Sequence, residues 1–217
     1  MNQEIANSVL KTGTSILAIV CKDGAVMGAD RRVTAGNIVL SKDTPKVRRI
    51  NDYLVVSFCG QAADALLSEK VIAAELRLKE LKTKIRPTVK EAANLIGMMY
   101  YRNIRSPSMI PHIVGSLVAG FNEDGTTEVY TIEPAGGTYP VTDYDANFGS
   151  GMPFILGLLE RQWKPDLTVK EGVELAVEAL KSSTQRDTAS GNGIDVFTIT
   201  KDGIKQAISQ KITPTYH

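Results

Sequence analysis

The chain has 217 residues, of which 43% are hydrophobic and 23% are charged, and its 25 Lys and Arg residues against 24 Asp and Glu residues give a formal net charge of +1. A chain of this length buries roughly 70% of its extended surface, which is enough for one good core. The balanced charge disfavours a nucleic-acid-binding protein, and no apolar run approaches the ~20 residues that span a bilayer. We therefore expect a globular protein that binds neither nucleic acid nor a membrane.

Several residue types and motifs are scarce, which excludes common catalytic machinery. The chain has only His112 and His217, too few for a multi-histidine zinc site or a Ser-His-Asp triad. It contains no GxxxxGK[ST], CxxC, HExxH or GxSxG motif, so no cofactor is expected. Cys21 and Cys59 lie in apolar runs and are predicted to be reduced and buried. The N-terminal segment lacks the regions of a secretory signal, which favours a cytoplasmic protein.

Hydrophobic patterning and turn signals predict the secondary structure. Apolar runs on either side of Asp-Gly turns are typical of β-hairpins, and apolar residues at helical spacing indicate helices. Thr88 and Thr168 each stand three residues before a Glu, which is the capping-box pattern of a helix start. In chain order the prediction is strands at 15–21, 25–29, 47–50 and 53–59, helices at 61–84 and 88–104, strands at 113–121 and 127–132, helices at 153–162 and 168–183, and strands at 194–200 and 204–208.

This order of elements indicates the fold class. Strict alternation of strands and helices would predict a parallel sheet, whereas runs of strands and pairs of helices predict antiparallel sheets in an α+β fold. We expect a four-layer αββα sandwich, with two sheets face to face and helices outside each. No Pro- or Ser-rich linker divides the chain, so we expect one domain.

Small polar residues and glycines stand at the ends of the predicted elements. Taken alone, Asp30 is typical of a turn, Lys46 of a solvated strand edge, and Asp187 of a helix end. Their order along the chain, together with the segments around them, carries more information than any one of them. These segments are Gly13-Thr14-Ser15 before the first strand, Asp30-Arg31-Arg32 after the second, Lys46, Gly60, Gly149-Ser150-Gly151, and the stretch from Gln185 to Gly191.

With this order and spacing the chain resembles the β-type subunits of the proteasome, which are N-terminal-nucleophile (Ntn) hydrolases and threonine peptidases. The resemblance covers nearly all of the chain after residue 13 and looks archaeal. Its matching stretches are Gly13-Thr14-Ser-Ile-Leu, Lys22-Asp-Gly24, Gly28-Ala-Asp30-Arg31-Arg32-Val-Thr34, Lys46, Gly60-xxx-Asp64, Gly149-Ser150-Gly151-Met-Pro-Phe, and Arg186-Asp187-xx-Ser190-Gly191-xxx-Asp195. It implies the Ntn fold and an endopeptidase that degrades unfolded proteins.

The resemblance also implies a maturation step. Residues 1–13 would be a propeptide, and 14–217 would form a single Ntn-hydrolase domain after the Thr14 hydroxyl cuts the bond that follows Gly13. A threonine hydroxyl is a poor nucleophile without a base. A freed α-amine has an unperturbed pKa of about 7.7–8.0, so part of it is neutral near pH 7 and can accept the hydroxyl proton. The uncleaved precursor should therefore be inert.

Each further site residue receives a role from the same resemblance. Lys46 would lie beside the Thr14 hydroxyl and lower the cost of a neutral amine and a developing alkoxide, with Asp30 as its ion-pair partner. The N–H of Gly60 would face the oxyanion, where one such donor contributes about 3–4 kcal/mol. The residues that would orient the amine are Ser150, Asp187 and Ser190.

The resemblance places substrate contacts as well. The backbone of Thr34 would hold the substrate as an added strand. The S1 pocket, which receives the residue before the cut, would have a bulky ring at its floor, and this predicts a preference for small or medium apolar residues. Its walls would be Val33, Arg48, Phe58, Ala62 and Leu66.

The implied partners are other β subunits in stacked heptameric rings, rings of α subunits, and an AAA+ regulatory ATPase that acts through the α rings. The apolar residues of the 61–84 helix are expected to form a long stripe that packs against neighbours. Two alternatives remain open: a non-catalytic, unprocessed β subunit of the same complex, and a subunit of a two-tier bacterial-type ATP-dependent peptidase. Occupation of every catalytic position by the expected residue type favours the active form.

Overall fold

The computed structural model describes residues 13–146 and 148–212. Its helices are α2 (Ala62–Thr83), α3 (Val89–Arg105), α4 (Met152–Gln162) and α5 (Val169–Arg186). The strands of the first half are β1 (Ile16–Cys21), β2 (Gly24–Asp30), β3 (Val33–Ala35), β4 (Ile38–Ser41), β5 (Val47–Arg49) and β6 (Leu54–Gly60). Those of the second half are β7 (Val114–Phe121), β8 (Thr127–Ile132), β9 (Thr138–Pro140), β10 (Tyr144–Asp145), β11 (Gly193–Thr200) and β12 (Gly203–Lys211).

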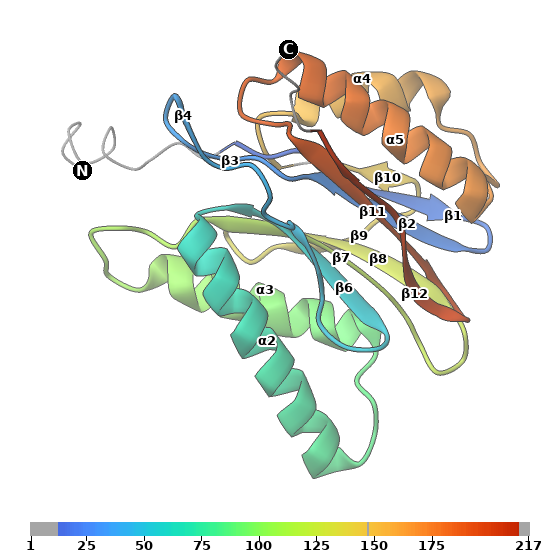
Figure 1. Cartoon of the computed structure of the whole chain (residues 1–217). Helices are drawn as coiled ribbons and strands as arrows, with labels where there is room; N and C mark the ends of the chain where they lie inside the picture. Colours follow the sequence, from blue (N-terminus) through green and yellow to red (C-terminus); the bar gives the residue numbers. More distant parts are fainter. Residues whose placement is uncertain (1–12, 147, 213–217) are drawn as a thin grey trace.

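Two five-stranded antiparallel sheets form the centre of the molecule. Sheet 1 has the strand order β10-β1-β2-β11-β12, and sheet 2 has the order β5-β6-β7-β8-β9. Figure 1 shows the two sheets face to face, with α2 and α3 outside sheet 2 and α4 and α5 outside sheet 1. The predicted αββα sandwich is confirmed. Within the described residues, the helices are too short or too polar to cross a membrane.

The core has three layers of apolar contacts because the inner strands are covered on both faces. In β1, Leu17 and Ile19 pack under α4 and α5, whereas Ile16 and Ala18 face sheet 2. This alternation follows from the two-residue period of a strand. It explains why β1 reads as a continuous apolar run. A third cluster lies between sheet 2 and the helices α2 and α3.

The helix starts agree with their capping-box patterns. The hydroxyls of Thr88 and Thr168 accept hydrogen bonds from the backbone N–H groups of Glu91 and Glu171, and both carboxylates reach back to the cap residue. Helix α5 continues to Arg186, three residues beyond the predicted end. As a result, the turn that carries Asp187 begins directly at the end of the helix.

The apolar residues of α2 do not all lie on its buried side, and the expected packing of this helix against neighbours stays a prediction. The buried residues of the helix are Ser68, Ile72 and Leu76. Other apolar residues of the helix are exposed; they are Leu66, Leu67, Val71, Leu78 and Leu81. Apolar residues at positions such as 66, 67 and 71 cannot share one narrow face with 68, 72 and 76 in a helix of 3.6 residues per turn.

Some short strands had no predictive pattern. The β3–β4 hairpin, β9 and β10 have two to four residues per strand. Strand β9 ends at Pro140. Strand β12 continues to Lys211, beyond its predicted end at 208. Strands this short carry too few residues for an alternation pattern to be recognised.

Candidate active site

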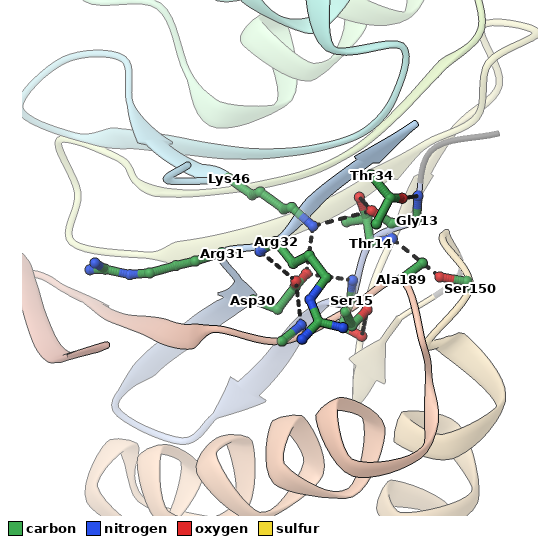
Figure 2. Close-up of polar contacts among 12 residues, drawn as sticks. Gly13, Thr14, Ser15, Asp30, Arg31, Arg32, Thr34, Lys46, Ser150 and Ala189 are labelled. Atoms are coloured by element: carbon green, nitrogen blue, oxygen red, sulfur yellow. Dashed lines mark hydrogen bonds and ion pairs between the residues drawn. The ribbon is translucent and has the colours of Figure 1, made fainter. Parts of the chain in front are cut away.

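The motif segments named in the sequence analysis meet at one end of the sandwich. Thr14 lies two residues before the start of β1, Asp30 ends β2, Gly60 ends β6, and Lys46 comes directly before β5. Ser150 lies in the turn before α4 and Ser190 in the turn after α5. Figure 2 shows the side chains of Asp30, Lys46 and Ser150 gathered around Gly13 and Thr14.

Thr14 is buried, and both its hydroxyl and its backbone N–H form hydrogen bonds. Its hydroxyl donates a hydrogen bond to the carbonyl oxygen of Gly13 at 2.6 Å, and its backbone N–H donates to Oγ of Ser150 at 3.3 Å. The Gly13 N–H donates to Oγ1 of Thr34 at 3.1 Å. Only 4% of Thr14 is exposed. The peptide bond between residues 13 and 14 is therefore fixed with a hydroxyl group against its carbonyl.

Asp30 and Lys46 form a buried ion pair beside this bond. Nζ of Lys46 lies 2.6 Å from Oδ1 of Asp30, and both side chains are almost fully buried. The Asp30 carboxylate also accepts hydrogen bonds of 2.9 Å from the backbone N–H groups of Ser15, Arg32 and Gly191. Lys46 donates to the Gly13 carbonyl oxygen at 3.3 Å. The ion pair thus holds a cation within reach of the carbonyl next to Thr14.

A second polar network lies on the opposite side of Thr14. Asp187 accepts hydrogen bonds from the hydroxyls of Ser150 at 2.6 Å and Ser190 at 2.5 Å. The Ser15 hydroxyl donates to Ser190 at 2.7 Å. Because Ser150 also accepts from the Thr14 N–H, Asp187 is connected through one hydroxyl to the nitrogen of Thr14. No role was assigned to Ser15 from the sequence, although its side chain completes this network.

At two glycines near the site, another segment of backbone lies too close to leave room for a side chain. Gly149 has φ +97°, and a β-carbon there would lie 2.1 Å from the carbonyl oxygen of Thr14. Gly60 has φ +130°, and a β-carbon would lie 2.1 Å from the carbonyl oxygen of Ile113. Both conformations are costly for residues with a side chain. The Gly149–Gly151 segment, which alone reads as an ordinary turn, therefore positions Ser150 against Thr14.

A pocket of about 70 Å³ opens beside Thr14, Lys46 and Gly60. All five residues expected to form the S1 wall line it: Val33, Arg48, Phe58, Ala62 and Leu66. Phe58 is buried, with 6% of its surface exposed. The lining residues that sequence reasoning missed are Thr44, Pro45, Ala65 and Glu69. The helical spacing of positions 62, 65, 66 and 69 would have indicated Ala65 and Glu69.

Arg31 is a second buried cation, and it fixes the segment that leads to Lys46. Its guanidinium binds both carboxylate oxygens of Asp195, at 2.9 and 2.5 Å. The guanidinium also pairs with Asp43 at 2.7 Å. The backbone carbonyl oxygen of Arg31 accepts a hydrogen bond from the N–H of Thr44 at 3.0 Å. Bidentate Arg–carboxylate pairs are geometrically specific. The sequence motif contained Arg31 and Asp195 but did not indicate that they pair.

Both cysteines are free, as expected. Cys21 is buried, whereas Cys59 is only half-buried, so the prediction of burial was wrong for Cys59. Burial, and to a smaller extent the charges of Asp23 and Glu171, raises the pKa of Cys21 to about 12. Burial also raises the pKa of Cys59 to about 11, against smaller lowering effects of Lys46 and Thr14. Both groups are thiols near pH 7. In the part of the chain that the structure describes, no cluster of His, Cys, Asp and Glu is arranged to hold a metal ion.

The αββα sandwich with a threonine two residues before β1 fits the Ntn-hydrolase class that the motifs implied. Comparison with known proteins agrees: the family model described as "Proteasome subunit" matches residues 10–199. The chain therefore belongs to the proteasome subunit family.

Three archaeal relatives illustrate the similarity. The proteasome subunit beta of Archaeoglobus profundus is 38% identical over 209 residues, which cover 96% of this chain and 94% of the relative. That of Thermoplasma acidophilum is 36% identical over 207 residues, covering 95% and 94%. The proteasome subunit beta 2 of Pyrococcus abyssi is 35% identical over 200 residues, covering 92% and 93%. The resemblance to archaeal proteasome β subunits is confirmed.

Proposed function

We propose that the chain is a catalytic β subunit of the 20S proteasome core, a threonine endopeptidase that cuts peptide bonds of unfolded proteins. The observation that carries this proposal is the environment of one peptide bond. The Thr14 hydroxyl lies 2.6 Å from the Gly13 carbonyl oxygen, and the ammonium of Lys46 lies 3.3 Å from the same oxygen. A nucleophile and a cation thus face the bond whose cleavage would free the Thr14 amine.

The first reaction is removal of the propeptide, residues 1–13. The Thr14 oxygen attacks the Gly13 carbonyl carbon while Lys46 stabilises the negative charge that develops on the carbonyl oxygen. The bond from this carbon to the Thr14 nitrogen breaks, the hydroxyl proton ends on that nitrogen, and an ester joins Gly13 to Oγ1. Water then hydrolyses the ester, which leaves a carboxylate on Gly13 and a free α-amine on Thr14.

The second reaction is hydrolysis of substrate peptides. The freed amine lies where the Thr14 N–H now donates to Ser150, so Ser150, Asp187 and Ser190 orient it. The neutral amine accepts the hydroxyl proton through a water molecule, and the oxygen attacks the substrate carbonyl. The N–H of Gly60 stabilises the oxyanion, and Lys46 favours the neutral amine and the alkoxide. The leaving amine takes the proton, and water hydrolyses the resulting ester.

Substrate binding uses the strand and the pocket beside Thr14. The backbone of Thr34 in β3 pairs with the substrate as an added strand, which gives affinity without sequence preference. The side chain before the cut enters the 70 Å³ pocket above Phe58. This small volume and the buried ring favour small or medium apolar residues. Cleavage dominated by Phe or Tyr in a peptide library would contradict this preference.

The wider assignments follow from family membership. We propose that 14–217 form one domain that assembles with other β subunits into heptameric rings, stacked between rings of α subunits in the cytoplasm. An AAA+ ATPase would deliver unfolded substrates through the α rings. Native mass spectrometry tests this arrangement, because particles that contain only β rings would favour the two-tier bacterial-type peptidase instead.

Replacement of the nucleophile tests the catalytic role. Assembled particles with Thr14→Ala should keep residues 1–13 by intact mass and should not be labelled by an electrophilic peptide inhibitor. The matched control is Thr188→Ala, an exposed threonine near the site, which should be processed and labelled like the wild type.

Two outcomes would contradict the proposal. A Thr14→Ala chain that still loses its leader would exclude self-cleavage by this hydroxyl. Wild-type particles that keep the leader in every copy, and that no inhibitor labels, would show the non-catalytic structural subunit.

A further inference from the structure

The pocket beside Thr14 has a charged residue on each of two facing elements. Helix α2 contributes Ala62, Ala65, Leu66 and Glu69, whose spacing places them on one face of the helix. Strand β5 contributes Arg48. Nε of Arg48 lies 3.5 Å from Oε2 of Glu69, and the two side chains are 26% and 29% exposed. The pair is therefore accessible from the pocket but partly withdrawn from water.

The charges around the pocket balance only if Glu69 is counted. Among the described residues that line it, the charged ones are Lys46, Arg48 and Glu69. The charge of Lys46 is already balanced by Asp30 at 2.6 Å. In the described structure the Arg48 side chain forms its ion pair with Glu69. Without the Glu69 carboxylate, the pocket would carry one uncompensated positive charge.

We propose that Glu69 is a specificity-determining residue, which neutralises Arg48 and so keeps the pocket selective for apolar over acidic residues before the cut. This inference rests on the proposed peptidase function. A substrate carboxylate that enters the pocket now meets Glu69, a like charge, and has to compete with it for the guanidinium. Once Glu69 is neutral, the planar guanidinium is free to bind that carboxylate through two parallel hydrogen bonds.

Glu69→Gln tests the inference because it removes the charge and keeps the shape. Processed particles would be assayed with two fluorogenic peptides that differ only in the residue before the cut, Glu in one and Leu in the other. We expect kcat/KM for the Glu peptide to rise at least ten-fold and kcat/KM for the Leu peptide to change less than three-fold. The gain should shrink in high salt, because added ions screen a partly exposed pair.

Three further variants make the result specific. Glu75→Gln removes an exposed carboxylate from the same helix outside this pocket, and should leave both rates unchanged. The double variant Arg48→Met/Glu69→Gln should lose the gain on the Glu peptide, because the cation that attracts the substrate is gone. Glu69→Ala also removes the carboxylate and should show the same gain on the Glu peptide. It serves as the test variant if Glu69→Gln particles do not assemble.

The outcomes separate this inference from the proposed function. A Glu69→Gln particle that cuts the Leu peptide normally and shows no gain on the Glu peptide overturns the role of Glu69 and leaves the peptidase assignment intact. A gain that persists in the double variant also overturns it. Wild-type particles that are unprocessed and cut neither peptide overturn both.

Discussion

Asp30→Asn is the sharpest test of how this site is held together. The Asp30 carboxylate is fully buried, is paired with Lys46 at 2.6 Å, and accepts three backbone hydrogen bonds of 2.9 Å. Asparagine keeps the shape but removes the charge. The amide nitrogen of asparagine is a donor, so it cannot accept the backbone hydrogen bonds that a carboxylate oxygen of Asp30 accepts. Lys46 then remains buried without a counter-charge.

The size of the effect follows from this burial. Removing one partner of a buried ion pair costs about 3–5 kcal/mol, because the remaining charge stays away from water. We therefore expect the free energy of unfolding to fall by about that amount, measured by urea denaturation at a fixed chain concentration. Leader removal, followed by intact mass, should slow at the same time, because Lys46 is no longer held near the Gly13 carbonyl.

Asp52→Asn is the matched control. Asp52 also forms an ion pair, with Arg49 at 2.7 Å, but the Asp52 side chain is 99% exposed, so the substitution should leave both measurements unchanged. If Asp30→Asn unfolds at the same urea concentration as this control, the argument from burial is wrong. If it is destabilised but loses its leader at the wild-type rate, the ion pair is structural only and Lys46 has no part in cleavage.

Three further results are expected. Gly149→Ala should be destabilised and should retain its leader by intact mass, because its β-carbon would lie 2.1 Å from the Thr14 carbonyl oxygen at φ +97°; Gly157→Ala, with open space around it, should be processed normally. The pKa of the Cys21 thiol is raised to about 12 in the folded chain, so the unfolded state loses this proton first and the wild-type free energy of unfolding falls between about pH 9 and 12, by up to ~1.4 kcal/mol per pH unit. Cys21→Ala should therefore make this fall above pH 9 less steep. An unchanged slope in urea titrations would show that this thiol ionises equally in both states. Thr88→Ala should cost about 1 kcal/mol in the same assay through loss of the helix cap, and no change would mean that the capping box contributes nothing.

Local patterns predicted most of the secondary structure. Helical spacing located α2, the two capping boxes located the starts of α3 and α5, and Asp-Gly turns located the hairpins. These signals involve residues a few positions apart, so they can be read without knowing the fold. The strands of β3, β9 and β10 were missed because two or three residues carry no period.

The site was predicted only through the order of its motifs. That order suggested which residues take part, and the structure brings Thr14, Asp30, Lys46 and Ser150 together. The contacts themselves join Thr14 to a residue 136 positions away and Ser15 to one 175 positions away. No local pattern encodes pairings over such separations, because they form only when the two sheets and their outer helices pack.

Sequence patterns thus fixed the helices, the hairpins, the antiparallel layers and the identity of the candidate nucleophile. The exposure of the apolar residues around α2, the approach of Gly149 to Thr14 and the pairing of Arg48 with Glu69 became visible only in three dimensions. The reason is that periodicity and turn chemistry depend on near neighbours along the chain, whereas burial, close approach and charge pairing depend on which surfaces meet after folding.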